Sequence, residues 1–185
     1  MPVVKPISGH TGCGGIMRYL TRGGRALAGD LANLSWSPEH PCGFRDWAEE
    51  MDFTRVAYGN HTPWKGRPAR TYKHYVLSPD PRDGISLEAL RDLARAWVAE
   101  NFAGFQAAVV YHDDNEGGVM HAHVVVNNTN LETGARLQDP APRELMRSAQ
   151  RLAEERGLSF FADGPGEGAA PLLAARGTRG RERVH

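Results

Sequence analysis

The fold is decided by QAAVVYHDDNEGGVMHAHVVVNN, residues 106–128, because the rest of the chain must pack around the structure that this stretch forms. Two β-rich runs, QAAVVYH and MHAHVVVNN, flank the segment DDNEGGV. Asp, Asn and Gly are residues that tight turns favour, so the stretch predicts an antiparallel hairpin.

Three of the chain's eight histidines, His112, His121 and His123, lie in this hairpin. Side chains two residues apart on a strand share a face, so His121 and His123 project together. The antiparallel partner strand returns alongside and can place His112 next to His121. Three imidazoles on one face leave coordination positions open, as catalytic metal sites do. The spacing therefore predicts a metal site.

Polar residues near the histidines extend the predicted site. Asp113, Asp114 and Asn127 are close enough in sequence to hydrogen-bond the second ring nitrogen of a ligand and fix its tautomer. The competing interpretation makes His121 and His123 exposed strand residues. The core-facing side chains opposite them would then be Met120, Ala122, Val124 and Val126.

Outward from the hairpin, helical and strand patterns alternate. We expect a short helix at 14–23, a poorly bounded helix within 41–59, a strand at 70–78, and helices at 86–102 and 142–157. Ser86 is the expected N-cap of the clearest helix, and Gly157 is the expected stop of the last one. This order predicts an α/β two-layer sandwich, with helices packed on a largely antiparallel central sheet.

The length of 185 residues, with 41% hydrophobic and 24% charged residues, suits one globular domain. We expect this domain to occupy residues 1–160, and residues 161–185, rich in Gly, Pro and Arg, to form a tail or linker. Neither a bilayer-spanning run nor a signal peptide is recognisable, which makes the cytoplasm the expected location. Two isolated cysteines, Cys13 and Cys42, indicate neither a disulfide framework nor a sulfur-rich zinc site.

Positive charge gathers in the N-terminal part of the chain. Residues 1–75 carry ten Lys and Arg against six Asp and Glu, and no acidic residue falls between Asp52 and Asp80. Cations and aromatic residues share this acid-free stretch: Arg55, Lys65, Arg67, Arg70, Lys73, Tyr58, Trp64, Tyr72 and Tyr75. Such a mixture suits a polyanion with bases that stack, and equally a solvated loop whose aromatic rings enter the core.

The order His112, Asp114, His121-Ala-His123 and then Val-Val-Val-Asn127 resembles the His-hydrophobic-His (HUH) motif of conjugative relaxases. These mobilisation endonucleases nick plasmid or integrative-element DNA. The resemblance covers residues 1–160, and KHYVLSPDP, residues 73–81, is similar to a strand motif of the family. The acidic, glycine-rich DDNEGG turn departs from the family pattern without removing a histidine. The resemblance implies an HUH-endonuclease-like fold.

The resemblance also implies a nucleophilic tyrosine near the N-terminus, in a short helix. Tyr19, within GGIMRYLTRGGRAL, residues 14–27, matches that position. Arginines at helical spacing form a basic edge where a phosphate would bind: Arg18, Arg22 and Arg25. The competing interpretation packs Tyr19 inward with Ile16 and Leu20, as an amphipathic helix requires.

Such an enzyme breaks a DNA strand by tyrosine attack, which yields a 5′-phosphotyrosine and a free 3′-hydroxyl. The implied cofactor is Mn²⁺ or Mg²⁺, and three neutral imidazoles favour Mn²⁺. The implied substrate is single-stranded or hairpin DNA at an origin of transfer, with accessory mobilisation proteins and a coupling protein as partners. We expect Arg67, Arg70 and Lys73 to hold the strand, and His74 either to contact phosphate or to pack in the sheet.

Other classes of protein share parts of this pattern. A rolling-circle replication initiator usually has its tyrosine after the histidine pair, whereas no tyrosine follows Tyr111 here. A non-catalytic single-stranded-DNA-binding module would use the acid-free stretch and a structural metal. A zinc hydrolase would use the three histidines without needing Tyr19.

Overall fold

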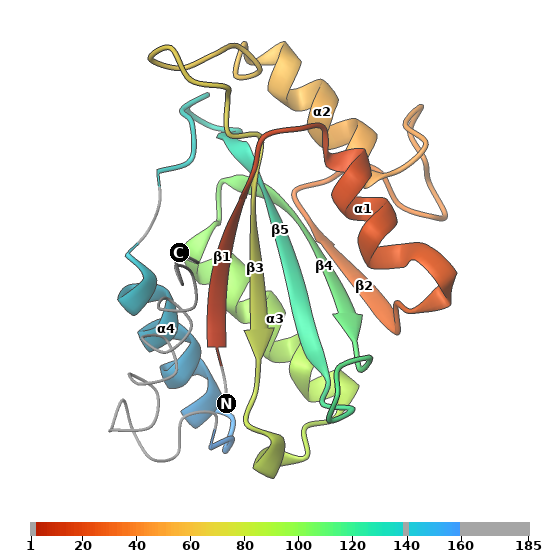
Figure 1. Cartoon of the computed structure of the whole chain (residues 1–185), viewed down its shortest axis with the longest axis vertical. Coiled ribbons are helices and arrows are strands. Elements are labelled where there is room, and N and C mark those ends of the chain that lie inside the picture. Colours follow the sequence, from red (N-terminus) through yellow and green to blue (C-terminus); the bar gives the residue numbers. More distant parts are fainter. Residues whose placement is uncertain (1–2, 139–140, 160–185) are drawn as a thin grey trace, which may run out of the picture.

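The computed structural model describes residues 3–138 and 141–159. Its centre is a five-stranded antiparallel sheet in the order β1-β3-β5-β4-β2 (Figure 1). The strands, in chain order, are β1 (Val3–Gly9), β2 (Ala28–Ala32), β3 (Tyr72–Ser78), β4 (Phe105–His112) and β5 (His121–Asn130). The predicted hairpin is β4 and β5, and it lies in the interior of the sheet with a strand on either side.

Helices cover both faces of the sheet (Figure 1). They are α1 (Cys13–Thr21), α2 (Trp47–Ala57), α3 (Leu87–Asn101) and α4 (Pro142–Glu154), with short 3-10 turns η1 (Arg22–Gly24) and η2 (Pro81–Asp83). Side chains of α1 and α2 pack on one face, and those of α3 and α4 pack on the other. The predicted antiparallel sheet with packed helices is confirmed. Because the helices divide between the faces, there are three layers where two were expected.

Alternation along β5 separates two hydrophobic cores. Val124 belongs to the core under α3 and α4, together with the fully buried Trp97. Its neighbour Val125 belongs to the core under α1 and α2. His121 and His123 have the same parity as Val125, so the two histidines lie on the α1 side of the sheet.

Local signals set several element boundaries as predicted. The Ser86 hydroxyl accepts the backbone N–H of Ala89 at 3.1 Å, which confirms Ser86 as the N-cap of α3. Gly157 follows α4 with φ +69°, a left-handed conformation that ends helices and favours glycine. Strands β1 and β2 were not predicted. Both are edge strands, where Pro6 is tolerated in β1 and the short run AGDLA suffices for β2.

The two cysteines are both free, with Cys13 buried and Cys42 exposed. Burial raises the pKa of the Cys13 thiol to about 12, which keeps it protonated and inert. Within residues 3–138 and 141–159, no helix has the length and apolar character that crossing a bilayer requires. The predicted tail at 161–185 lies outside the described residues.

Candidate active site

The hairpin register brings the three histidines together. In the β4–β5 ladder His112 lies opposite His121, and Val110 lies opposite His123. All three histidines are buried, and one ring nitrogen from each lies within 4.8 Å of the other two. The predicted pairing of His112 with His121 is confirmed, and the interpretation of His121 and His123 as exposed strand residues is wrong.

The outer nitrogen of each imidazole has a fixed partner. His112 Nε2 lies 2.6 Å from the Leu20 carbonyl oxygen, and His121 Nδ1 lies 3.0 Å from that of Val119. A carbonyl oxygen only accepts, so each of these contacts is a hydrogen bond when the ring nitrogen carries the proton. The Asn115 amide nitrogen is farther from His121 Nδ1, at 3.4 Å. His123 Nδ1 lies 2.9 Å from Nε2 of His74. The two carbonyl contacts favour one tautomer for His112 and one for His121, and all three contacts orient the rings, as residues around metal ligands do.

The inner nitrogens face one another. Among the described residues, His112 Nδ1 and His123 Nε2 are buried without a hydrogen-bond partner. Burying two unpaired acceptors costs about 1–3 kcal/mol each unless something binds them. With the proton of each ring on its outer nitrogen, which for His123 requires Nδ1 to donate to His74, the three inner nitrogens present lone pairs to the same point. This donor set fits a divalent cation held by three imidazoles.

The electrostatics keep the rings in the form that binds a cation. Burial, followed by the neighbouring rings of His74, His121 and His112, lowers the pKa of His123 to about 3. Burial also lowers the pKa of His112, although its hydrogen bond to the Leu20 carbonyl acts in the opposite direction. His112 and His123 are therefore neutral at neutral pH, as metal ligands must be.

Asp114 stands on the inner side of the cluster. Its Oδ1 lies 3.8 Å from both His112 Nδ1 and His121 Nε2, and its Oδ2 lies 2.6 Å from a guanidinium nitrogen of Arg25. Burial acts to raise the pKa of Asp114, but the attraction of Arg25 outweighs it and lowers the pKa. We expected Asp114 to bond an outer nitrogen. The structure corrects this, because backbone carbonyls and His74 occupy those positions.

Tyr19 lies outside the core, at the end of α1 nearest the cluster. Its side chain is 47% exposed, whereas Leu20 is fully buried, so the inward-packing interpretation of Tyr19 is wrong. Arg25 donates to the Tyr19 carbonyl at 3.1 Å, and its guanidinium carbon lies 5.0 Å from the Tyr19 ring centroid. Arg25 therefore bridges Tyr19 and Asp114. The Leu20 carbonyl ties the same helical turn to His112.

The arginines near Tyr19 reach it by a different route from the one expected. The helix ends at Thr21, and the chain then turns through Gly23 and Gly24, both with positive φ. Arg22 still lies 5.4 Å from the Tyr19 ring, and Arg25 reaches back from beyond the turn. The predicted basic edge thus depends on the glycine turn and not on continued helical spacing. Arg18 is exposed within α1.

The structure separates the residues expected to hold DNA. Arg67 is exposed, and Arg70 donates to the Leu137 carbonyl. Lys73 is buried, with its ammonium 2.9 Å from the Ser8 hydroxyl of β1. His74 is also buried and bonds His123. The expectation for Lys73 is corrected, because its ammonium contacts Ser8 of β1. Of the two roles expected for His74, its burial supports packing in the sheet.

Asn127 lies further along β5, under α2. Its side-chain oxygen accepts from Arg55 at 3.1 Å, and its amide nitrogen donates to the Met51 carbonyl and to Gln106, each at 3.0 Å. Both ends of the amide are thus occupied away from the histidines. The expectation that Asn127 orients a metal ligand is corrected, and Asn127 instead joins α2 to the sheet.

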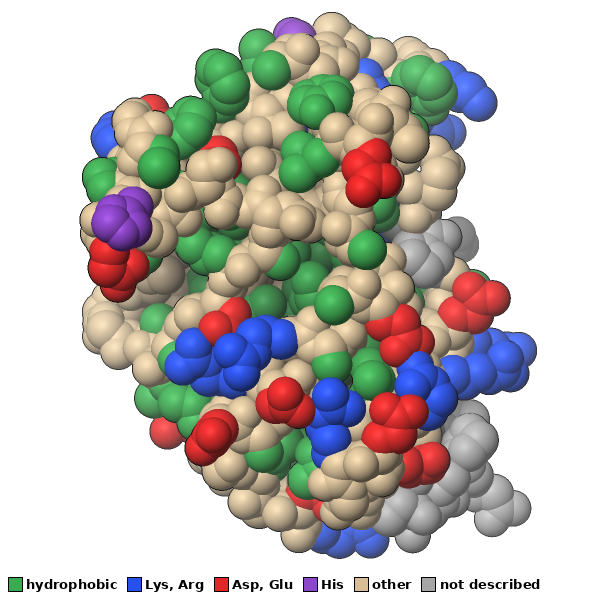
Figure 2. Space-filling model, turned by 180° about the vertical axis from the view of Figure 1, so that it is seen from behind, with side chains coloured by type: hydrophobic (Ala, Val, Ile, Leu, Met, Phe, Trp, Pro, Cys, Tyr) green, Lys and Arg blue, Asp and Glu red, His purple; other side chains and the backbone are tan. Residues whose placement is uncertain are grey.

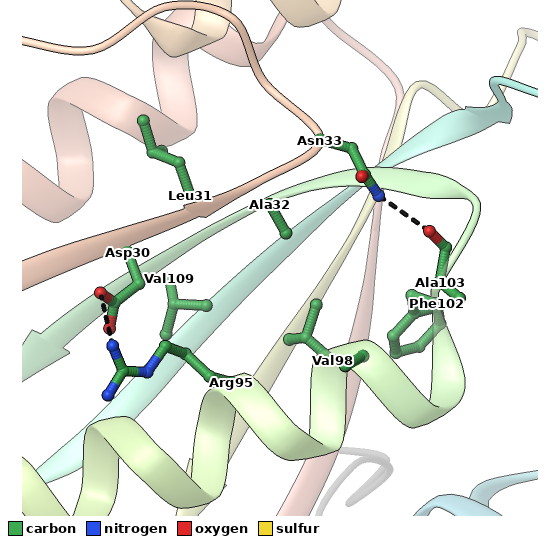
Figure 3. A pocket seen from close by; sticks show the side chains of 10 residues that line it. Asp30, Leu31, Ala32, Asn33, Arg95, Val98, Phe102, Ala103 and Val109 are labelled. Carbon is green, nitrogen blue, oxygen red and sulfur yellow. Dashed lines mark hydrogen bonds and ion pairs between the residues drawn. The ribbon is translucent and has the colours of Figure 1, made fainter.

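A cavity of about 350 Å³ lies on the opposite face of the sheet, between β2 and α3 (Figure 3). Its lining is mostly apolar, with Val98 and Phe102 of α3 on one side. An Arg95–Asp30 ion pair of 4.0 Å lies near one end, and Asn33 donates to the Ala103 carbonyl at the other (Figure 3). None of the three histidines lines it, so the cavity is separate from the cluster.

Comparison with known proteins identifies the class to which this fold and site belong. The family model of the MobA/VirD2-like relaxase nuclease domain matches residues 28–158. The match covers more than half of the chain, and the chain therefore belongs to this family of DNA endonucleases. The matched range contains all three histidines and begins after Tyr19.

Individual relatives agree with this assignment. Protein rlx of Staphylococcus aureus is 24% identical over 112 residues, which are 60% of this chain and 34% of that protein. The chain thus spans about a third of the length of this relative. The Mn-bound MobM relaxase domain with plasmid pMV158 oriT DNA (23 nt) matches 95% of this chain and 98% of its own, at 15% identity and a TM-score of 0.52. This likeness shows a shared fold.

Proposed function

We propose that the chain nicks and rejoins one DNA strand at an origin of transfer, with Tyr19 as nucleophile. Family membership supports the nuclease activity. The MobM relaxase domain, which shares the fold, has been solved bound to oriT DNA. The observation that carries the proposal is the connection of Tyr19, through Arg25 and Asp114, to three buried histidines whose inner nitrogens converge.

The proposed reaction is a transesterification. The phenol oxygen of Tyr19 bonds to phosphorus, and the bond from phosphorus to the 3′ oxygen breaks. The phenol loses its proton, and the departing 3′ oxygen gains one. The products are a 5′-phosphotyrosine and a 3′-hydroxyl. One phosphodiester replaces another, so the step is nearly isoenergetic and the reverse attack rejoins the strand.

Positioning is the main task of the protein in this step. A phenol has a pKa of about 10 and is a weak nucleophile at neutral pH, so the phosphate must be polarised and held in line. The inner nitrogens of His112, His121 and His123 would hold a divalent cation. That cation, when bound, supplies positive charge that stabilises the phosphate as charge develops in the transition state. Arg22 and Arg25 lie beside the Tyr19 ring, where their guanidinium groups add to the positive field.

The proposed function also has consequences for the domain boundaries, the partners and the metal ion. We propose that residues 1–160 form the catalytic unit and that 161–185 are a tail. Accessory mobilisation proteins and a coupling protein are proposed partners, on the strength of the family alone. We also propose Mn²⁺ as the preferred ion, because three imidazoles suit it better than Mg²⁺.

A covalent-adduct assay tests the proposed function. The protein is incubated with Mn²⁺ and end-labelled single-stranded oligonucleotides that tile the DNA flanking its gene, and a protein–DNA adduct resistant to denaturation is sought. Tyr19→Phe should give no adduct and should bind the reactive oligonucleotide within twofold of wild type. Tyr58→Phe is the matched control, since Tyr58 is also exposed and its hydroxyl donates to the Leu131 carbonyl, away from the cluster.

Three results would contradict the proposal. An adduct that survives in Tyr19→Phe would assign the nucleophile to another residue. Cleavage to a free 5′-phosphate without an adduct would indicate hydrolysis by water. Binding without any cleavage, across the whole tiled region, would favour a non-catalytic DNA-binding module.

A further inference from the structure

The loop between α2 and β3 exposes a tryptophan well away from the histidine cluster. Trp64 is 58% exposed. The Lys65 ammonium lies 5.9 Å from its ring centroid, and the Arg136 guanidinium carbon lies 5.1 Å from it. We call these three residues the Trp64 platform. Both distances are within the range of cation–π attraction, so two positive charges flank the ring.

The platform is held by contacts from two distant segments. Trp64 and Arg67 exchange both backbone hydrogen bonds, at 2.9 and 3.0 Å, across a turn in which Lys65 and Gly66 have positive φ. Arg136 comes from the turn after β5, and its guanidinium makes three hydrogen bonds of 3.0 to 3.2 Å to Thr62. The tight turn presents the indole, and Thr62 holds the Arg136 cation near it.

Exposure of one aromatic ring is common and by itself indicates nothing. The charge around this ring is more informative. The stretch that carries Trp64 has no acidic residue between Asp52 and Asp80, and Arg67 adds an exposed cation beside the platform. By contrast, basic and acidic side chains are interspersed over the half of the molecule covered by α3 and α4, seen from behind (Figure 2). The platform therefore favours an anionic ligand that also presents a flat apolar surface.

The platform and the cluster lie at different ends of the sheet. The loop that carries Trp64 leads into β3 at Tyr72, whereas His123 pairs with Val76 further along that strand. Four strand residues span about 13 Å. In Figure 1 this loop lies beside α2, and the turn that joins β4 to β5 lies at the opposite end of the sheet. A nucleotide on the platform is therefore not the nucleotide that Tyr19 attacks.

We propose that the Trp64 platform binds an unpaired base of the DNA strand by stacking, while Lys65, Arg67 and Arg136 contact the adjoining phosphates. Unpaired bases stack on aromatic side chains whatever their sequence, and cations alongside track the backbone. The inference rests on the proposed function, since it supplies a second anchor for the same strand. It assigns to Trp64 and Arg136 a role in DNA binding that is separate from cleavage.

The test measures binding of a 25-nucleotide single-stranded oligothymidine and of a 25-base-pair duplex, without added metal. Trp64→Ala should lower the single-strand affinity roughly 5- to 150-fold, the range that one base–aromatic stack supplies. Trp64→Phe should retain most of the affinity but lose the quenching of tryptophan fluorescence that a stacked base causes. Arg136→Gln should reduce the slope of log affinity against log salt by about one.

The matched control is Phe53→Ala. Phe53 is 61% exposed on α2, and its described ring contact is with Phe44 rather than with a cation. It should leave both affinities unchanged. Single-strand affinity that is unchanged in Trp64→Ala would overturn the proposal, and so would an equal loss of duplex affinity.

The test also distinguishes failure of this inference from failure of the proposed function. His121→Ala should abolish cleavage yet retain fluorescence quenching by the oligothymidine. Normal adduct formation with unchanged single-strand affinity in Trp64→Ala would reject the platform alone. Loss of affinity in Trp64→Ala, in a protein that forms no adduct on any oligonucleotide, would support the platform and reject the nicking mechanism.

Discussion

His74 offers a sharp test of how the histidine cluster is assembled. Its Nε2 lies 2.9 Å from Nδ1 of His123, and the two rings stack with centroids 5.1 Å apart. A His123 that binds a cation through Nε2 carries its proton on Nδ1 and donates it to His74 Nε2. In the His74→Phe variant a ring remains to pack against His123, but this acceptor is lost. The Nδ1–H of His123 then has no partner in a buried position. We expect the variant to fold and to bind metal more weakly.

The expected loss follows from the geometry. A buried donor left unpaired costs about 1–3 kcal/mol. Removing a residue that orients a metal ligand typically lowers metal affinity 10- to 100-fold, which is about 1.4–2.8 kcal/mol. The two ranges agree, so we expect Mn²⁺ affinity to fall by 10- to 100-fold. His74→Gln retains a side-chain oxygen that accepts from His123, and its loss should be smaller.

Isothermal titration with Mn²⁺ at pH 7.5 (a pH above the unperturbed histidine pKa of about 6.5) measures this effect directly. His61→Phe is the matched control, because His61 is exposed in the loop before β3. It should bind Mn²⁺ as wild type does. If His74→Phe binds Mn²⁺ within twofold of wild type, while circular dichroism shows it folded, then His74 does not orient His123.

Further expectations concern the metal, the bridging ion pair and pH. Each of His112→Ala, His121→Ala and His123→Ala should lose Mn²⁺ binding and cleavage together, and calorimetry showing wild-type affinity in all three would exclude the cluster as the metal site. Cleavage should reach half its maximum at a lower concentration of Mn²⁺ than of Mg²⁺, and the reverse order in a titration would contradict the imidazole argument. Arg25→Gln should slow adduct formation about 10-fold or more, because it removes the charge between Tyr19 and Asp114, whereas Arg45→Gln, which removes an exposed ion pair with Glu49, should not. In the metal-free protein, His123 binds a proton below about pH 6.5 when unfolded but only near pH 3 when folded. The contribution of His123 to the free energy of unfolding is therefore present above pH 6.5 and is lost as pH falls towards 3. This free energy decreases by up to about 1.4 kcal/mol per pH unit. His123→Gln should flatten that dependence in denaturant titrations, and an identical pH profile would contradict it.

The histidine cluster could be predicted from the sequence because its geometry is local. His121 and His123 share a face by strand alternation, and a short Asp-, Asn- and Gly-containing turn sets the register that brings His112 opposite His121. The N-cap of α3 at Ser86 is local in the same sense. These features depend on residues a few positions apart, so a single sequence displays them.

Other parts of the site depend on contacts between distant segments. His74 meets His123 across 49 positions, and only because β3 pairs with β5. The Leu20 carbonyl meets His112 across 92 positions, because α1 packs on that face of the sheet. Both contacts follow from the order of strands and the docking of a helix. No spacing along the chain predicts either of them.

The residues whose expected roles were wrong also show the difference between local features and contacts between distant segments. Lys73 and Asn127 have the polar side chains expected of a DNA contact and of a residue that orients a ligand. The structure buries Lys73 against Ser8 of β1 and Asn127 against Arg55 of α2. Side-chain chemistry and local periodicity were readable from the sequence. Which faces meet was decided by burial of apolar surface across the whole chain, and that depends on many weak contacts between segments far apart in sequence.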